Sequence, residues 1–165
     1  MHIAHLGVAV FVVGVTMVGG YQEERDVRMG PGDTVSVGGY TFTFVGVREA
    51  RGPNYTAFVG DVDLSKNGKV FKRLNPEKRN YLTSQMPMTE AAIDAGLTRD
   101  VYVSLGEPLA GKDWAVRVYY KPFVDWIWFG CLFMALGGLV AASDRRYRLR
   151  ARAPAGRAAL EGAAS

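Results

Sequence analysis

The feature that most constrains this chain is an apolar run at residues 3–20, which contains no Asp, Glu, Lys or Arg. A run of this length is typical of a transmembrane helix. His5 is its only ionisable side chain. An ionisable residue inside a membrane span is costly and is by default a candidate functional site. His5 is also near enough to the start of the run to reach water or a backbone carbonyl. Both interpretations remain open on this evidence alone.

A second apolar run covers residues 123–143 and is also long enough to cross a bilayer. The sequence therefore predicts a transmembrane helix over 1–20, a domain over 21–122, a second transmembrane helix over 123–143 and a partly disordered basic tail over 144–165. No Lys or Arg precedes the first run, which argues against a signal peptide. A helix that begins without a flanking anchor suggests that the sequence continues upstream.

The net charge of +4 is unevenly distributed. Residues 144–165 hold six Arg against one Asp and one Glu, whereas residues 21–122 hold 14 basic and 13 acidic side chains. Nucleic-acid binding is not expected, because it needs basic charge clustered on the folded domain itself. The positive-inside rule places the tail in the cytoplasm and the middle domain in the periplasm. His5 then lies in the cytoplasmic half of the membrane.

The middle domain has the pattern of a mainly antiparallel β sandwich or small barrel with about seven strands. Gly38-Gly39 and Asn67-Gly68 predict hairpin turns, the second of type I′. Thr89 as an N-cap and Gly96 as a stop predict one short helix over 88–95. The charged residues after the first run are interpreted as a solvated strand beside the membrane. The expected strands lie at residues 35–37, 40–44, 55–65, 69–74, 100–105 and 114–120, with one more within residues 75–83, where a turn precedes it.

Few residues of the middle domain suggest chemistry. It has no His, and the single cysteine of the chain, Cys131, lies in the second apolar run. No C-x-x-C, no haem-attachment C-x-x-C-H and no glycine-rich phosphate loop occurs. These absences argue against a hydrolase, a metal enzyme and a nucleotide enzyme. Asp94, Arg99 and Asp100 are expected to form an ion-pair network between the short helix and a strand.

Small residues in the two runs provide weak packing signals. Gly7 and Gly14 lie seven residues apart on one helical face, where another helix or a flat ligand could approach closely. Gly138 and Ala142 form a small-xxx-small pair in the second run. Glycine is also common in membrane helices in general, so neither pair is specific.

Long blocks of the sequence resemble the C-terminal part of the CcmF family, the haem lyase component of bacterial cytochrome c maturation. They run in order over residues 1 to about 148. The blocks are AHLGVAVFVVGV (4–15), ERDVRMGPGD (24–33), GPNY (52–55), PEKRNY (76–81), MTEAAIDAGLTRDVYVSLGE (88–107), WAVRVYYKPFVDWIW (114–128) and MALGGL (134–139).

The resemblance implies a multi-pass protein of the bacterial inner membrane. Such a protein takes haem from the haem chaperone CcmE and attaches it to the C-x-x-C-H thiols of apocytochrome c, together with thiol-handling partners. The family also holds a haem b in the membrane between two histidines. The histidine of its A-H-x-G motif is one of these axial ligands, and the motif matches here at His5, whereas His2 matches no family ligand.

Two observations limit what this chain could do alone. His2 and His5 are three residues apart on one side of a helix, so they cannot bind opposite faces of one haem. The second ligand is therefore expected from outside these 165 residues. The family's tryptophan-rich haem-handling segment and its outer-face histidines have no counterpart here, since Trp126 and Trp128 belong to the end of a span. The chain is thus expected to be a C-terminal fragment or one part of a split lyase, inactive without the N-terminal remainder. The alternative is a membrane-anchored periplasmic scaffold that binds partners and no cofactor.

Overall fold

The computed structural model describes residues 2–84 and 86–143. These residues divide into two units, one of residues 2–13 with 127–143 and one of residues 14–126 without residue 85. The basic tail predicted over 144–165 lies outside the described residues.

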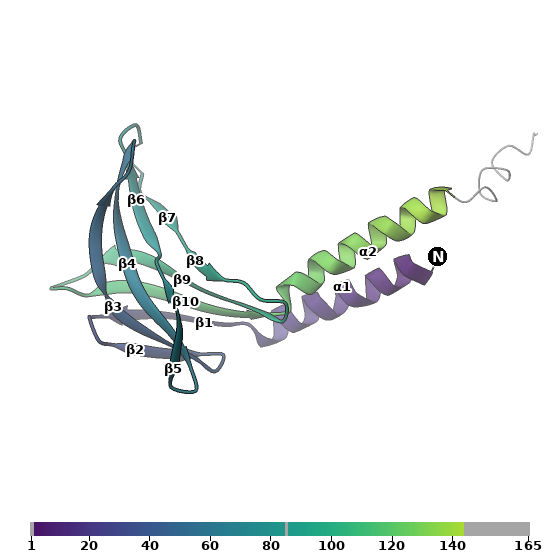
Figure 1. Cartoon of the computed structure of the whole chain (residues 1–165), viewed down its shortest axis with the longest axis horizontal. Helices are drawn as coiled ribbons and strands as arrows, with labels where there is room; N and C mark the ends of the chain where they lie inside the picture. The colour runs from purple at the N-terminus through teal and green to yellow at the C-terminus, as the bar shows by residue number, and fades with distance from the viewer. Residues whose placement is uncertain (1, 85, 144–165) are drawn as a thin grey trace, which may run out of the picture. The chain divides into compact units, whose positions relative to one another are not determined.

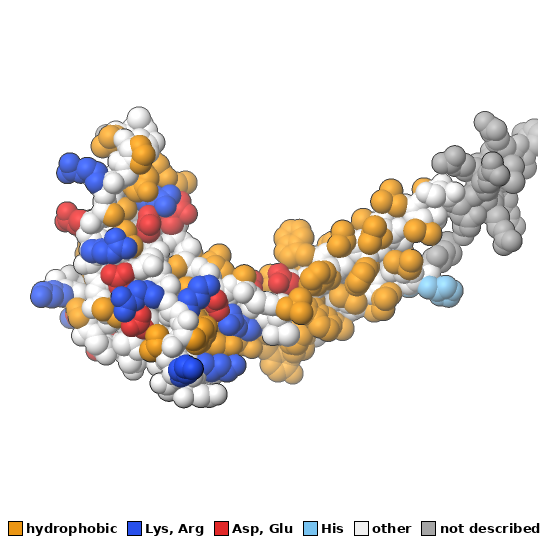
Figure 2. Space-filling view, in the orientation of Figure 1, with side chains coloured by type: hydrophobic (Ala, Val, Ile, Leu, Met, Phe, Trp, Pro, Cys, Tyr) orange, Lys and Arg blue, Asp and Glu red, His pale blue; other side chains and the backbone are white. Residues whose placement is uncertain are grey.

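Two long apolar helices flank the β domain in the chain, as predicted. Helix α1 spans His2–Tyr21 and helix α2 spans Val124–Ser143, and each has 20 residues. By length and composition both are able to cross a membrane. Apolar side chains cover most of the face of the helices that Figure 2 shows. An apolar surface that is not covered by protein is stable in lipid rather than in water.

The β domain consists of two antiparallel sheets (Figure 1). The first has the strand order β1-β10-β9-β8, and the second has the order β2-β3-β4-β6-β7, with β5 also paired to β4. The bounds in the first sheet are β1 Glu23–Met29, β8 Ala92–Asp94, β9 Arg99–Pro108 and β10 Trp114–Pro122. Those in the second are β2 Thr34–Val37, β3 Tyr40–Arg51, β4 Tyr55–Lys66, β5 Lys69–Leu74, β6 Glu77–Tyr81 and β7 Met88–Glu90.

The core lies between the two sheets and follows from alternating side chains on the central strands. On β9, Val101, Val103 and Leu105 are fully buried, and Phe42 and Phe44 face them from β3. Other buried members are Met29, Val37, Tyr40, Val62, Leu64, Leu74, Trp114, Val116 and Val118. The domain therefore has the sandwich architecture that the pattern of short alternating strands predicts.

Both predicted hairpin turns are present. Gly38 and Gly39 have φ of +57° and +77°, and Asn67 and Gly68 have φ of +52° and +75°. Positive φ at both central residues is the mark of a type I′ turn, so this prediction for Asn67-Gly68 is confirmed. The strand that returns from it begins at Lys69 and ends at Leu74, as predicted.

The short helix predicted over residues 88–95 is wrong. This segment forms β7, which pairs with β6, and β8, which pairs with β9. The chain thus passes from one sheet to the other at this point. An isolated helix of eight residues is too short to be stable, whereas both sheet edges offer backbone partners to this segment. The sequence predicts seven strands and the charged strand that is now β1, so β7 and β8 complete the ten strands among the described residues.

Candidate functional site

The two helices approach one another through glycines in the unit formed by residues 2–13 and 127–143. A Cβ placed on Gly7 would lie 2.6 Å from the backbone nitrogen of Met134 and 2.8 Å from the carbonyl oxygen of Gly130. A Cβ on Gly137 would lie 2.5 Å from the backbone nitrogen of Ala4. These distances are too short for any side chain. The glycines therefore create an antiparallel seam in which the two backbones nearly touch.

The seam decides between two sequence interpretations. Gly7 contacts a neighbouring helix, so its role in this chain is helix packing rather than approach to a flat ligand. Gly138 takes no part in this seam, because no atom lies within 4 Å of a Cβ placed there. Adjacent residues differ by about 100° around a helix, so Gly137 faces α1 and Gly138 faces away. The seven-residue spacing of Gly130 and Gly137 is the sequence signal that identifies the correct face.

His5 lies on α1 away from the seam. Its side chain is exposed, and Ala4 and Gly7 contact the facing helix. At about 100° per residue, His5 is rotated by roughly 100° from Ala4 and by roughly 160° from Gly7. The imidazole therefore does not lie between α1 and α2. His2 is exposed as well, three residues earlier on the same helix.

Other chemistry-bearing side chains of the helices are dispersed. Cys131 is exposed on α2, and Trp128 near the start of α2 is 70% exposed. In the described part of the chain, no three His, Cys, Asp or Glu side chains lie close enough together to hold a metal ion.

A polar cluster joins the two sheets of the β domain. The Asp94 carboxylate on β8 pairs with Lys72 of β5 at 2.6 Å and with Arg99 of β9 at 2.5 Å. Arg99 Nε also donates to the Tyr40 hydroxyl at 2.9 Å, and Lys66 Nζ donates to the same oxygen at 3.2 Å. The cluster thus links five strands, which restrains one end of the sandwich.

The charges in this cluster shift the pKa values of two of its groups. Burial raises the pKa of the Asp94 carboxyl, but hydrogen bonds from Lys72 and Arg99 outweigh burial, so the pKa lies below its usual value. In the same way, burial raises the pKa of the Tyr40 hydroxyl and the bonds from Lys66 and Arg99 lower it further than burial raises it. The contacts of Asp94 and Tyr40 with these cations therefore hold neighbouring strands together.

The predicted network is confirmed for Asp94 and Arg99, but it joins strand to strand rather than helix to strand. Asp100 instead accepts a hydrogen bond from the Gly96 amide at 3.2 Å. Sequence reasoning missed Tyr40 and Lys72, which lie 59 and 22 residues away from their partners. Contacts over such separations depend on strand order, which no local pattern specifies.

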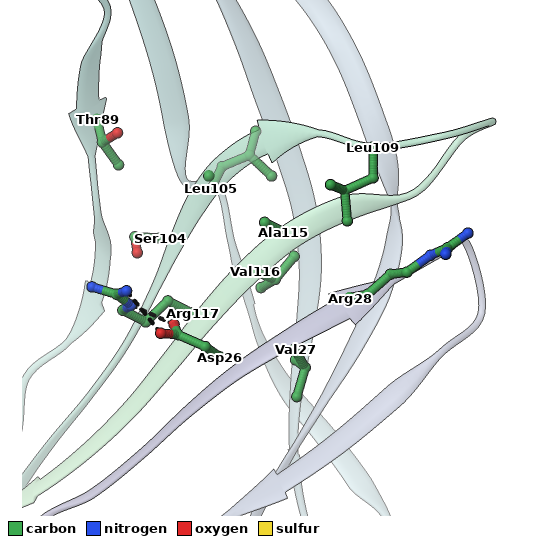
Figure 3. A pocket seen from close by; sticks show the side chains of 11 residues that line it. Asp26, Val27, Arg28, Thr89, Ser104, Leu105, Leu109, Ala115, Val116 and Arg117 are labelled. Atoms are coloured by element: carbon green, nitrogen blue, oxygen red, sulfur yellow. Dashed lines mark hydrogen bonds and ion pairs between the residues drawn. The ribbon is translucent and has the colours of Figure 1, made fainter.

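The first sheet also carries an open groove of about 600 Å³ (Figure 3). An ion pair between Asp26 of β1 and Arg117 of β10 lies in it, with 2.7 Å between Asp26 Oδ2 and Arg117 Nη2. The hydrogen bond from Arg117 lowers the pKa of Asp26. The Thr89 and Ser104 hydroxyls and apolar side chains complete the wall. Because Asp26 and Arg117 are paired with each other, the groove has the character of a binding surface rather than a catalytic one.

Comparison with known proteins identifies the family of this β domain. A family model described as the CcmF C-terminal beta-sandwich matches residues 20–122, more than half of the chain. The chain belongs to the CcmF family. The match covers the β domain.

A cytochrome c-type biogenesis protein CcmF from Pseudomonas aeruginosa is 55% identical over 150 residues, which is 91% of this chain and 23% of that protein. The Escherichia coli protein of the same name is 53% identical over 147 residues, again 23% of its length. A solved structure titled cytochrome c heme lyase CcmF superposes on 83% of this chain with a TM-score of 0.70 at 22% identity, which supports the fold. The chain thus spans about a quarter of the length of the CcmF relatives it matches.

Proposed function

We propose that this chain is the C-terminal portion of a cytochrome c haem lyase. In this role it helps to transfer haem from the haem chaperone CcmE to the C-x-x-C-H thiols of apocytochrome c. The observation that carries the proposal is the identity of 55% over 91% of the chain with a cytochrome c-type biogenesis protein CcmF. Because that relative is about four times longer, the activity belongs to the assembly of this chain with the N-terminal remainder of the lyase.

Within that assembly, His5 serves as one axial ligand of a membrane haem b. The exposed face of α1 fits such a role, because His5 is directed away from the seam with α2. A bound haem supplies an iron whose redox potential depends on its axial ligands and surroundings. His2 is on the same side of the same helix and cannot reach the opposite porphyrin face. The second ligand therefore comes from a helix outside this chain.

The test is the haem content of the complex formed with the N-terminal portion of a CcmF protein. We expect the purified complex to contain haem b and the His5→Ala variant to lose most of it. His2→Ala is the matched control and should retain haem, since it removes an exposed imidazole one turn away. An unchanged haem content in the His5→Ala complex would refute the ligand role.

A second candidate function is that of a periplasmic scaffold without a cofactor of its own. The groove of about 600 Å³ with its paired Asp26 and Arg117 favours this alternative. A scaffold requires that His5→Ala leave both haem content and cytochrome c maturation intact. A loss of maturation caused only by changes in the β domain would then support it.

The membrane location follows from the same proposal. Helices α1 and α2 cross the bacterial inner membrane, with the β domain in the periplasm and the arginine-rich residues 144–165 in the cytoplasm. A reporter enzyme that works only in the cytoplasm should be active when fused after Arg157, and one that works only in the periplasm should be inactive there. Activity of a periplasmic reporter at that position would reverse the orientation.

A further inference from the structure

The turn between β4 and β5 has an unusual charge distribution. Residues 64–76 contain four basic side chains and no Asp or Glu. Lys66 and Lys69 close the turn and lie directly opposite each other in the register of the two strands. Like charges at such a position destabilise a hairpin. Lys66 Nζ donates to the Tyr40 hydroxyl at 3.2 Å, whereas Lys69 is exposed at the turn. An anionic surface placed against the turn would offset the repulsion between the two lysines by binding Lys69.

Apolar side chains stand exposed beside these lysines. Val70 is 55% exposed and Phe71 is 48% exposed. Val70 pairs with Ser65 and Lys72 pairs with Leu64, so Phe71 is an extra residue at the bulge between them. We call residues 66–72 the hairpin tip. Cations flanking exposed aliphatic and aromatic groups are characteristic of surfaces that lie in a membrane interface.

The hairpin tip lies at the end of the sandwich from which both helix connections leave. Strand β1 begins two residues after α1 ends, and α2 begins two residues after β10 ends. The Phe71 ring contacts the Tyr40 ring, with 6.2 Å between centroids, and Tyr40 stacks on Tyr120 of β10 at the same distance. Figure 2 shows several Lys and Arg side chains over the part of the domain that carries the β4–β5 turn in Figure 1.

We propose that the hairpin tip binds the surface of a bilayer that contains anionic phospholipids. Lys69, which is exposed at the turn, contacts the phosphates, and Val70 and Phe71 enter the apolar layer beneath the head groups. The connections that enter the helices are too short for this end of the domain to leave the vicinity of the bilayer, which favours lipid over an acidic protein partner. The inference rests on the proposed membrane location and is independent of the haem ligand.

The experiment measures immersion depth in the full chain reconstituted in nanodiscs. A nitroxide is attached to Val70→Cys in a Cys131→Ala background, and its accessibility to oxygen and to a water-soluble nickel chelate is compared. Leu82→Cys is the control, because Leu82 is 76% exposed and lies beyond the opposite end of β4, about 35 Å along the strand. We expect an oxygen-to-nickel ratio several-fold higher at position 70 than at position 82.

Charge is tested with Lys69→Glu and its matched control Lys112→Glu, which makes the same change in the β9–β10 turn. Adding phosphatidylglycerol to phosphatidylcholine should increase the immersion of the label at position 70. Lys69→Glu should abolish this increase, and Lys112→Glu should leave it intact. The proposal is overturned if the immersion of the label at position 70 changes neither with lipid charge nor with Lys69→Glu.

A label at Leu136, an exposed residue of α2, separates failure of this inference from failure of the membrane location. A label at position 70 in water while the label at position 136 is in lipid overturns only the hairpin proposal. Both labels in water overturn the membrane location together with it. A label at position 70 that is shielded from both probes even in detergent indicates a protein contact and also overturns the proposal.

Discussion

Asp94 illustrates how single residues hold this domain together. Its carboxylate bridges Lys72 and Arg99, and its side chain is only 12% exposed. Each partner comes from a different strand, so the contact holds the edges of the two sheets against one another. A carboxylate buried to this extent is stable only because both cations remain beside it.

Asp94→Asn should therefore lower the free energy of unfolding by about 2 kcal/mol, since the change weakens two charged hydrogen bonds. Urea unfolding of the full chain in detergent, followed by tryptophan fluorescence, measures the effect. Glu49→Gln is the control, because Glu49 is exposed. Equal stability of the two variants would contradict the bridging role.

The same pair predicts a pH dependence. The pKa of Asp94 lies below its usual value of 3.8 in the folded state, so the carboxylate contributes stability above that pH. The contribution is lost as the pH falls below 3.8 and through the folded-state pKa. The stability difference between wild type and Asp94→Asn should therefore shrink at acid pH. A difference that grows on acidification would have the wrong sign.

Gly38 and Gly39 form a natural comparison within one turn. Both have positive φ, so alanine at either position costs about 1 kcal/mol of backbone strain. Only at Gly38 would a Cβ also collide with the Tyr120 ring, at 2.2 Å from its Cγ. Gly38→Ala should therefore be less stable than Gly39→Ala by about 1–3 kcal/mol. Equal unfolding midpoints in urea would show that the Tyr120 ring moves aside freely.

At the scale of elements, the helix seam depends on which glycine faces the partner. We expect Gly137→Val to disrupt the packing of α1 on α2, because the valine side chain would overlap sterically with the backbone of Ala4. Overpacking of this kind costs about 1–3 kcal/mol. Gly138→Val is the matched control with open space around it. Thermal unfolding of the helical signal in detergent compares the two, and equal midpoints would argue against the seam.

The sequence predicts elements well where a local signal exists. The Asn67-Gly68 turn specifies both strands beside it, and the length of each apolar run specifies a helix. The helix prediction for residues 88–95 fails because the local helical preference is weaker than the backbone pairing that β6 and β9 offer. These two strands lie on either side of the segment in the sequence, so a local pattern does not reveal the pairing. The sequence offers Gly7 and Gly138 only as weak packing signals. It does not specify that Gly7 and Gly137 lie in the seam, because the orientation of a helix about its axis is set by its neighbour.

At the scale of the whole molecule, the chain matches one portion of the CcmF proteins. It covers 23% of its CcmF relatives, and α1 directs His5 away from the α2 seam. The assignment of His5 came from the A-H-x-G motif, because an apolar run with one histidine also fits a structural role. Its position on the outward face is consistent with a haem site completed by another part of the lyase.

The most direct test of this account is the optical spectrum of the lyase complex that carries His5→Gly, with and without added imidazole. The account predicts that the bands of a six-coordinate b-type haem are lost in the variant and return when imidazole occupies the space left by the side chain. The corresponding His2→Gly complex should keep the wild-type spectrum throughout. Bands that persist in the His5→Gly complex without imidazole would contradict the central claim.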